Sequence, residues 1–345
     1  MKIETEVFGT TADGQEVTRF TLFNSKGHSV SVMNFGATLL DVIVPDREGN
    51  LGNVNLSFNR LDPYLAGHPY FGSSVGRFCN RIKEGKFTID GQNYQVTVNS
   101  GKHHIHGGKK NFSYQFWLGE AIEGESEVGV RFSLKSPHGE EGYPGTVTAN
   151  ALYTWNDQDE LKIEYSATTD APTHVNLTNH SYWNLAGVRS GSAMDHIATI
   201  HADQWLDVDA DLIPSGQLNE VGGTPLDFRT PTSFDLRLDE LAHTKGYDHC
   251  FVVRGEPGSL RRAAKVVDPK SGRGLEIETT QPGMQLYTAN HLPGNERSNG
   301  FASHEAFCLE TQHYPNAPNV SSFPTTLLKP GESLREVTIH RFTVE

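Results

Sequence analysis

Alternation of apolar and polar residues is the feature that most limits what this chain can fold into. At positions 128–134, Val, Val, Phe and Leu occupy every second position, and Gly or polar residues stand between them. Residues 161–165 repeat the pattern, with Leu, Ile and Tyr separated by Lys and Glu. Successive side chains of a strand point to opposite faces, so this pattern indicates strands with one face in a core. Because helical periodicity is scarce, the sequence predicts an all-β fold, a large antiparallel sandwich or barrel.

Turn signals separate the expected strands. Lys86–Val98 has Asp90-Gly91 at its centre, which favours a tight hairpin. Two further turns are expected within residues 20–44. A few short helices are expected in the connections, for example around Leu61–Ala66 and Leu236–Thr244.

The 345 residues allow one large domain or two ordinary ones. The most polar stretch, Arg254–Arg273, is flanked on both sides by strand-like sequence, so we interpret it as a hairpin or surface excursion. We therefore expect a single domain over residues 1–345. Sheets of that extent could present a concave face, which suits the binding of sugars.

Charge and cysteine content narrow the function classes. The 42 acidic and 29 basic side chains give a net charge of −13, which argues against nucleic acid or an anionic membrane as partner. Neutral small molecules remain open. No apolar run is long enough to cross a bilayer, and we find no signal peptide at the N-terminus. Three cysteines without CxxC spacing fit a reducing compartment, so we expect a cytoplasmic protein.

Phe307–Asn319 offers a candidate acid or base. Alternation places Phe307, Leu309 and Thr311 on one strand face and leaves Glu310 on the other, between small neighbours. The two prolines of this stretch end the strand nearby. A carboxylate at a strand end with open space before it suits proton transfer, although a surface glutamate on an edge strand fits the same pattern.

A histidine follows a second polar strand face. His180 ends the polar set of residues 174–180, and Tyr182 and Trp183 follow at once. Such a face is either solvated or the floor of a groove. The two aromatic residues favour the groove, because aromatic rings stack on the C–H faces of sugars and could form a wall.

His104 and His106 stand at a spacing that metal sites use and would share a strand face. A metal site needs further ligands, and the glycines and lysines at 107–110 supply none. We therefore predict no metal. Gly107 and Gly108 would instead let a ligand approach the backbone, and one of the histidines could be structural.

Four more polar residues are candidates for holding a ligand. Asn80 and Arg81 are adjacent and can fork two neighbouring hydroxyls or hold a carboxylate, although an ion-pair role is equally open for the arginine. Asp248 lies among aromatic residues and fits either a turn or a ligand contact. Gln285 and Tyr287 would share a strand face.

These segments together resemble the aldose 1-epimerases. The resemblance is in family order from about residue 35 to the C-terminal strand. Its most specific elements are runs within 76–82, 105–108, 176–185, 246–249, 282–290 and 307–319. It implies a large β-sandwich of the galactose-mutarotase type with a concave carbohydrate-binding face. It also implies interconversion of the α and β anomers of free aldohexoses such as glucose and galactose, without metal or organic cofactor.

The resemblance also implies roles for particular residues. Glu310 matches the general base and His180 the general acid, and His106 matches a second histidine near the ring oxygen. The positions that match substrate-binding residues are Asn80, Arg81, Asp248 and Gln285. We expect Arg81 to lie near Glu310 and to keep it ionised in the resting enzyme.

Six positions depart from the usual family pattern and leave the preferred sugar open: Lys102, His103, Ser113-Tyr114, Trp183 and Ala306. Two other functions stay open, a non-catalytic carbohydrate-binding protein and an epimerase for another sugar or a sugar phosphate. The latter would need a cluster of cations, and only Arg77 and Arg81 stand close together near the proposed site. A monomer and a homodimer are both compatible with the sequence.

Overall fold

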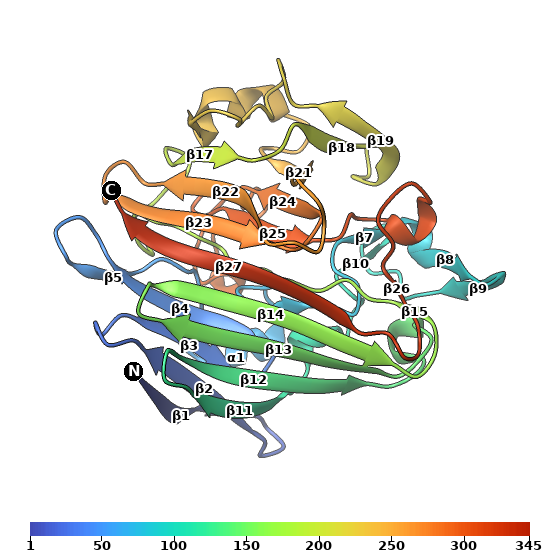
Figure 1. Ribbon diagram of the computed structural model, residues 1–345, viewed down its shortest axis with the longest axis horizontal. Helices are drawn as coiled ribbons and strands as arrows, with labels where there is room; N and C mark the ends of the chain where they lie inside the picture. The colour runs from blue at the N-terminus through green and yellow to red at the C-terminus, as the bar shows by residue number, and fades with distance from the viewer.

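The computed structural model describes residues 1–345, and strands dominate it. The largest sheet has nine strands and is antiparallel throughout. Figure 1 shows it running across the front of the molecule. Its strands, in spatial order, are β11 (Leu118–Glu123), β12 (Glu127–Ser136), β13 (Val147–Asn156), β14 (Glu160–Thr169), β27 (Leu334–Val344), β23 (Arg273–Thr279), β22 (Arg261–Val267), β17 (Ile197–Ile200) and β20 (Thr232–Ser233).

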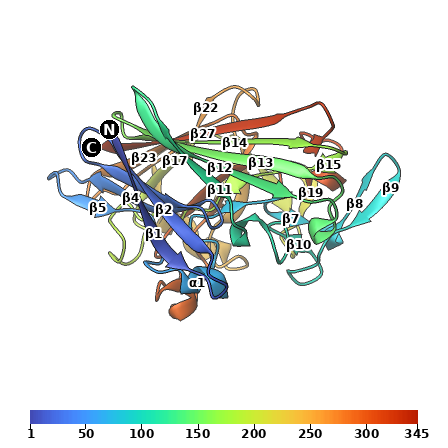
Figure 2. The same ribbon diagram turned by 90° about the horizontal axis from the view of Figure 1, so that it is seen from below.

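Two five-stranded antiparallel sheets lie behind this large sheet, and Figure 2 shows the N-terminal one as a separate layer. The N-terminal sheet has the order β1 (Lys2–Thr10), β2 (Glu16–Phe23), β3 (Ser29–Met33), β4 (Thr38–Pro45) and β5 (Leu51–Asn53). The other has the order β19 (Pro214–Glu220), β18 (Gln204–Val208), β21 (Asp248–Val252), β24 (Gly283–Tyr287) and β25 (Cys308–Gln312). The prediction of an all-β antiparallel sandwich is confirmed.

Short ribbons and helices complete the chain. The ribbons pair β7 (Arg81–Ile82) with β10 (His104–Ile105), β6 (Ser74–Val75) with β16 (Thr178–Asn179), β15 (Thr173–His174) with β26 (Leu327–Leu328), and β8 (Lys86–Ile89) with β9 (Gln92–Gln95). The helices are α1 (Asp62–Ala66) and the 3₁₀ turns Lys83–Gly85, Phe112–Tyr114, Glu140–Gly142, Phe234–Leu241, Glu296–Ser298 and Ala317–Asn319. No helix has the length and apolar character that crossing a bilayer requires.

Local sequence signals explain several of these elements. The hairpin β8–β9 turns at Asp90 and Gly91, which both have the positive φ that a type I′ turn needs. Arg254–Arg273 contains β22 and the turn of the β22–β23 hairpin, and β23 begins at its last residue, so it belongs to a hairpin as expected. The helix expected at Leu236–Thr244 is instead a 3₁₀ segment over Phe234–Leu241, because Arg237 leaves the helical region at φ −130°.

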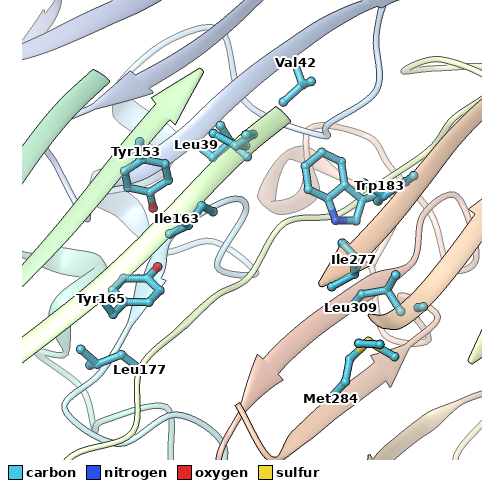
Figure 3. Packing of buried hydrophobic residues seen from close by; sticks show 14 of the residues in the cluster. Leu39, Val42, Tyr153, Ile163, Tyr165, Leu177, Trp183, Ile277, Met284 and Leu309 are labelled. Atoms are coloured by element: carbon cyan, nitrogen blue, oxygen red, sulfur yellow. The ribbon is translucent and has the colours of Figure 1, made fainter. Parts of the chain in front are cut away.

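The main hydrophobic core lies between the large sheet and the two smaller ones. Apolar residues of β2, β3 and β4 meet those of β12, β13 and β14, and residues of β24 and β25 meet those of β22 and β23. Figure 3 shows this packing, with Tyr153, Ile163 and Tyr165 toward one end and Met284 and Leu309 toward the other. The alternation at residues 128–134 and 161–165 puts its apolar side into this core, as predicted. The three cysteines are free and buried.

Candidate active site

A cavity of about 240 Å³ opens beside strand β25. Its lining comes from segments between residues 69 and 310, so distant parts of the chain build it together. Six of the seven residues predicted from the sequence to act in the site line it: Asn80, Arg81, His106, His180, Asp248 and Glu310. Gln285 does not line it.

Glu310 and Gln285 are neighbours across two paired strands. The register of β24 and β25 places them directly opposite each other, and residues opposite each other project from the same sheet face. The apolar residues Phe307 and Leu309 point into the main core. Gln285 donates from Nε2 to Asp248 Oδ1 at 2.6 Å, so it lies behind that carboxylate and orients it.

His180 faces Glu310. Its backbone N–H donates to Ser73 O at 3.0 Å, and its carbonyl accepts from Gly72, so the segment after β16 is fixed from both sides. His180 Nε2 lies 3.7 Å from Glu310 Oε1, and both side chains are almost fully buried. Neither residue is a surface group, which removes the solvated interpretation of both.

Burial moves the pKa values of these two groups in opposite directions. Burial and the nearby Asp248 carboxylate raise the pKa of Glu310 to about 8, and Arg81 opposes this rise. Burial lowers the pKa of His180 to about 4. Arg81 is close enough to act on Glu310, as expected. The expectation that Glu310 is ionised in the resting site is wrong at neutral pH, because burial and Asp248 outweigh Arg81.

Asn80 and His106 hold each other through reciprocal bonds. His106 N donates to Asn80 O at 3.1 Å, and Asn80 N donates to His106 Nδ1 at 3.2 Å. Both backbones are left-handed, with φ of 59° and 51°. Non-glycine residues adopt this region uncommonly, and such outliers gather at functional sites.

The left-handed turn at His106 also separates it from His104. Strand β10 ends at Ile105, so the two histidines do not share a strand face as expected. The ring of His104 bonds Thr97 O through Nδ1 and Tyr143 Oη through Nε2, each at 2.6 Å, and is structural.

Gly107 allows two backbone segments to pack closely and does not make room for a ligand. A Cβ at this position, where φ is 83°, would lie 1.9 Å from Gly76 O. The expectation that this glycine admits a ligand is therefore wrong, since the space beside it is filled by a neighbouring backbone segment.

The bond to Asn80 fixes the tautomer of His106. Because Nδ1 accepts a hydrogen bond, the neutral ring carries its proton on Nε2 and can donate from that atom. Burial, His180 and Arg81 lower the pKa of His106 well below its usual value, so the ring stays neutral. His106 is suited to donate a hydrogen bond and not to supply a positive charge.

Arg81 is held by the loop that follows Glu310. Its carbonyl accepts from Asn316 N at 2.7 Å, and Asn316 is also left-handed, with φ of 58°. Its guanidinium lies 3.8 Å from Asp248 Oδ2 and donates to Asn80 Oδ1 at 3.4 Å. The strand that carries Glu310 and the ribbon that carries Arg81 are thereby joined.

Aromatic rings form much of the wall. Tyr70, Tyr182 and Tyr287 line the cavity, together with the ring of His291. The expectation that Trp183 would share this wall is wrong: it is fully buried and packs against Phe342 in the main core, because side chains adjacent in an extended segment face opposite ways. Sequence reasoning missed Tyr70 and His291, which lie outside any alternating pattern.

None of the departures from the family pattern lines the cavity itself, although Tyr114 packs edge-on against the lining residue Tyr70. Trp183 and Ala306 are core residues, and Ser113 donates to Ser74 O. Lys102 and His103 both approach Asp211, with nitrogens 2.8 and 3.4 Å from Oδ2.

One group of potential metal ligands exists, and it is not part of the cavity: Asp195, His196 and Asp268. Two of these side chains already bond to other protein groups. His196 Nε2 accepts from Leu185 N at 3.0 Å, and Lys270 Nζ lies 2.5 Å from Asp195 Oδ2.

A carboxylate–imidazole pair in a small aromatic-walled cavity is suited to acid–base chemistry on a sugar-sized ligand, and comparison with known proteins identifies the class as a carbohydrate isomerase. The family model described as aldose 1-epimerase matches residues 18–341. The chain is 44% identical to the galactose mutarotase of Bos taurus over 91% of both chains. It is 33% identical to the aldose 1-epimerase of Escherichia coli over 96% of this chain and 97% of the relative.

Solved structures agree with these matches. The galactose 1-epimerase of Lactobacillus acidophilus superposes with a TM-score of 0.89 at 26% identity, over 99% of both chains. An aldose epimerase homologue from C. elegans gives 0.85 at 29% identity, over 94% of this chain and 98% of that one. The chain belongs to the aldose 1-epimerase family and is an isomerase with aldose 1-epimerase activity.

Proposed function

We propose that the chain interconverts the α and β anomers of free aldohexoses, galactose and glucose among them, with Glu310 and His180 as the proton-transfer pair. The observation that carries the proposal is the 3.7 Å approach of Glu310 Oε1 and His180 Nε2 at the cavity wall. The names of the relatives, galactose mutarotase and aldose 1-epimerase, support the choice of sugar.

The reaction divides the two proton transfers between these groups. Ionised Glu310 takes the proton of the anomeric hydroxyl while protonated His180 gives its proton to the ring oxygen, and the C1–O5 bond breaks. Rotation about C1–C2 then presents the other face of the aldehyde. Closure reverses both transfers and returns the two groups to their starting states.

The pKa values of the two groups support a resting pair that shares one proton. With the pKa of Glu310 near 8 and that of His180 near 4, one proton resides on the pair at neutral pH, mainly on Glu310. The reactive form, with the proton on His180, contains the same number of protons. The pair therefore reaches its reactive form by an internal shift, without exchange with bulk water.

The remaining cavity groups orient the sugar in this proposal. Neutral His106 donates a hydrogen bond from Nε2 on the side of the sugar where the ring oxygen lies. The guanidinium of Arg81 donates two hydrogen bonds to neighbouring hydroxyls. Asn80 and Asp248 bind further hydroxyls. Gln285, which stands behind Asp248, acts by holding that carboxylate.

A sugar phosphate fits this cavity less well than a free sugar. Two carboxylates line it, those of Asp248 and Glu310, and Arg81 is the single arginine or lysine among the lining residues. With the proton on Glu310, Asp248 balances Arg81, so a phosphate dianion would lose its hydration without meeting a net positive charge. Galactose 1-phosphate, which cannot undergo ring opening at its blocked anomeric oxygen, serves as a binding probe and should not compete with galactose.

Polarimetry of freshly dissolved α-galactose and α-glucose tests the proposal. The wild type should speed the decay of optical rotation above the buffer rate, and Glu310→Gln and His180→Asn should lose most of this effect. Glu305→Gln, a nearby substitution outside the lining, is the matched control. A control that loses activity as strongly as Glu310→Gln would contradict the assignment.

We further propose that residues 1–345 fold as one domain and act in the cytoplasm as a monomer or homodimer. The main core contains residues from Phe20 to Phe342, which supports one cooperative unit. A single calorimetric unfolding transition, sedimentation velocity and cell fractionation test the three parts of this proposal separately.

A further inference from the structure

The imidazole of His180 is stacked on two tyrosine rings. Its plane lies 14° from that of Tyr70, with ring centres 5.9 Å apart, and 10° from that of Tyr182, with centres 4.9 Å apart. Tyr70 has a left-handed backbone, with φ of 63°, which a bulky residue rarely adopts. The backbone of Tyr70 is therefore strained at the position where its ring packs against His180.

No protein group forms a hydrogen bond to Nδ1 of His180. A catalytic histidine is commonly oriented by an acceptor at the nitrogen opposite its reactive one. His180 presents Nε2 to Glu310 and lacks such an acceptor on its other side. Its orientation must come from the rings packed against it.

We propose that Tyr70 and Tyr182 are positioning residues that fix the ring of His180 and stabilise its protonated form through their π faces. This inference rests on the proposed role of His180 as the acid. A cation within about 6 Å of an aromatic centre is attracted by the negative ring face, and an imidazolium is such a cation. Burial acts against protonation, so the tyrosines supply a compensating attraction.

Other titratable groups also approach this ring, and the test must separate them from the tyrosines. Glu310 favours the protonated ring, and His106 packs edge-on against it. Tyr287 meets it at 89° and so offers no parallel face. The groups to be held constant are Glu310, His106, Tyr287 and His68.

Fluorination weakens the negative face of an aromatic ring with little change in its shape, which isolates the proposed attraction. Phenylalanine and trifluorophenylalanine are placed in turn at positions 70 and 182. The Tyr→Phe variant at each position is the reference for its trifluoro counterpart, because both lack the hydroxyl group. Relative to that reference, the trifluoro variants should lose about 2- to 5-fold in kcat per ring. Trifluorophenylalanine at Phe71, which contacts Tyr182 and has no ring contact with His180, is the control.

A second readout needs no turnover. Histidine NMR spectra without sugar, at the lowest pH at which each variant stays folded, give the protonated fraction of His180, assigned with His180→Asn. This fraction should fall about 2- to 5-fold on fluorination at 70 or 182 and stay constant for position 71. Equal fractions and equal kcat for the Phe and trifluoro pairs would overturn the inference. A wild type without mutarotation would overturn the proposed function alone, because the NMR comparison still decides the role of the tyrosines.

Discussion

Trp183 and Phe307 exchange two backbone hydrogen bonds, with N···O distances of 2.7 and 3.0 Å. Each residue stands three positions from a proposed proton-transfer group, His180 in one segment and Glu310 in the other. The bridge between them, flanked by side chains of the main core, sets the separation of the two segments. The proposed pair is thus positioned by the most buried part of the fold.

Because the two groups act in one step, their loss should not be additive. Glu310→Gln and His180→Asn should each lower kcat for α-galactose by about 10²- to 10⁴-fold, and the double variant should be little worse than either alone. Polarimetry or a coupled β-galactose assay measures this. Multiplied effects in the double variant would show that the two residues act independently.

The pH dependence of kcat/KM should be a broad plateau. The active pair carries one proton, so activity should fall below about pH 4, where a second proton binds, and above about pH 8, where the proton is lost. Rates corrected for the buffer reaction, at pH values where the protein stays folded, provide the profile. A fall in activity centred near pH 6.5 would contradict it, since it would report an unperturbed histidine.

Two substitutions that each remove a charge should shift the alkaline end of the kcat/KM plateau in opposite directions. Asp248→Asn removes a negative neighbour and keeps the acceptor for Gln285, so the pKa of Glu310 should fall and the limit should drop by about 1 pH unit. Arg81→Gln removes the opposing charge and should raise the limit. Asp211→Asn, outside the lining, should leave it unchanged.

Acid should destabilise this protein strongly. An unfolded histidine with a pKa of about 6.5 takes up a proton that a buried neutral one does not, so the free energy of unfolding falls as the pH drops from 6.5 toward 4. The expected loss is about 2 kcal/mol per residue by pH 5. Urea unfolding at pH 7 and pH 5 measures it. Burial lowers the pKa to about 4 in five histidines: His104, His174, His180, His249 and His340.

Glu310 should itself lower stability at alkaline pH. Its folded pKa of about 8 exceeds the usual value of a glutamate, so the stability contribution is greatest in acid and is lost as the pH rises toward 8. Glu310→Gln should therefore raise the free energy of unfolding at pH 8 by a few kcal/mol, about 2 to 4, while it removes activity. Urea unfolding against the half-buried control Glu305→Gln, which lies outside the cavity lining, decides it. A less stable Glu310→Gln at pH 8 would contradict the argument.

The sequence predicted the strands better than their partners. Alternation identified β12 and β14, because burial of one face acts on every second residue. It carried no sign that β14 pairs with β27, whose residues lie about 170 positions later, since such pairing depends on the whole sheet. The site shows the same division. Alternation and small neighbours placed Glu310, whereas the left-handed backbones of Tyr70 and Asn80 have no glycine to mark them.

The central position of β27 has a consequence for synthesis of the chain. This strand, Leu334–Val344, joins β14 to β23 and so links the two halves of the nine-stranded sheet, yet it follows every other strand of that sheet in the sequence. Until it emerges, two unjoined half-sheets expose strand edges to other nascent chains. Translation must therefore pass residue 344 before the nine-stranded sheet can be completed.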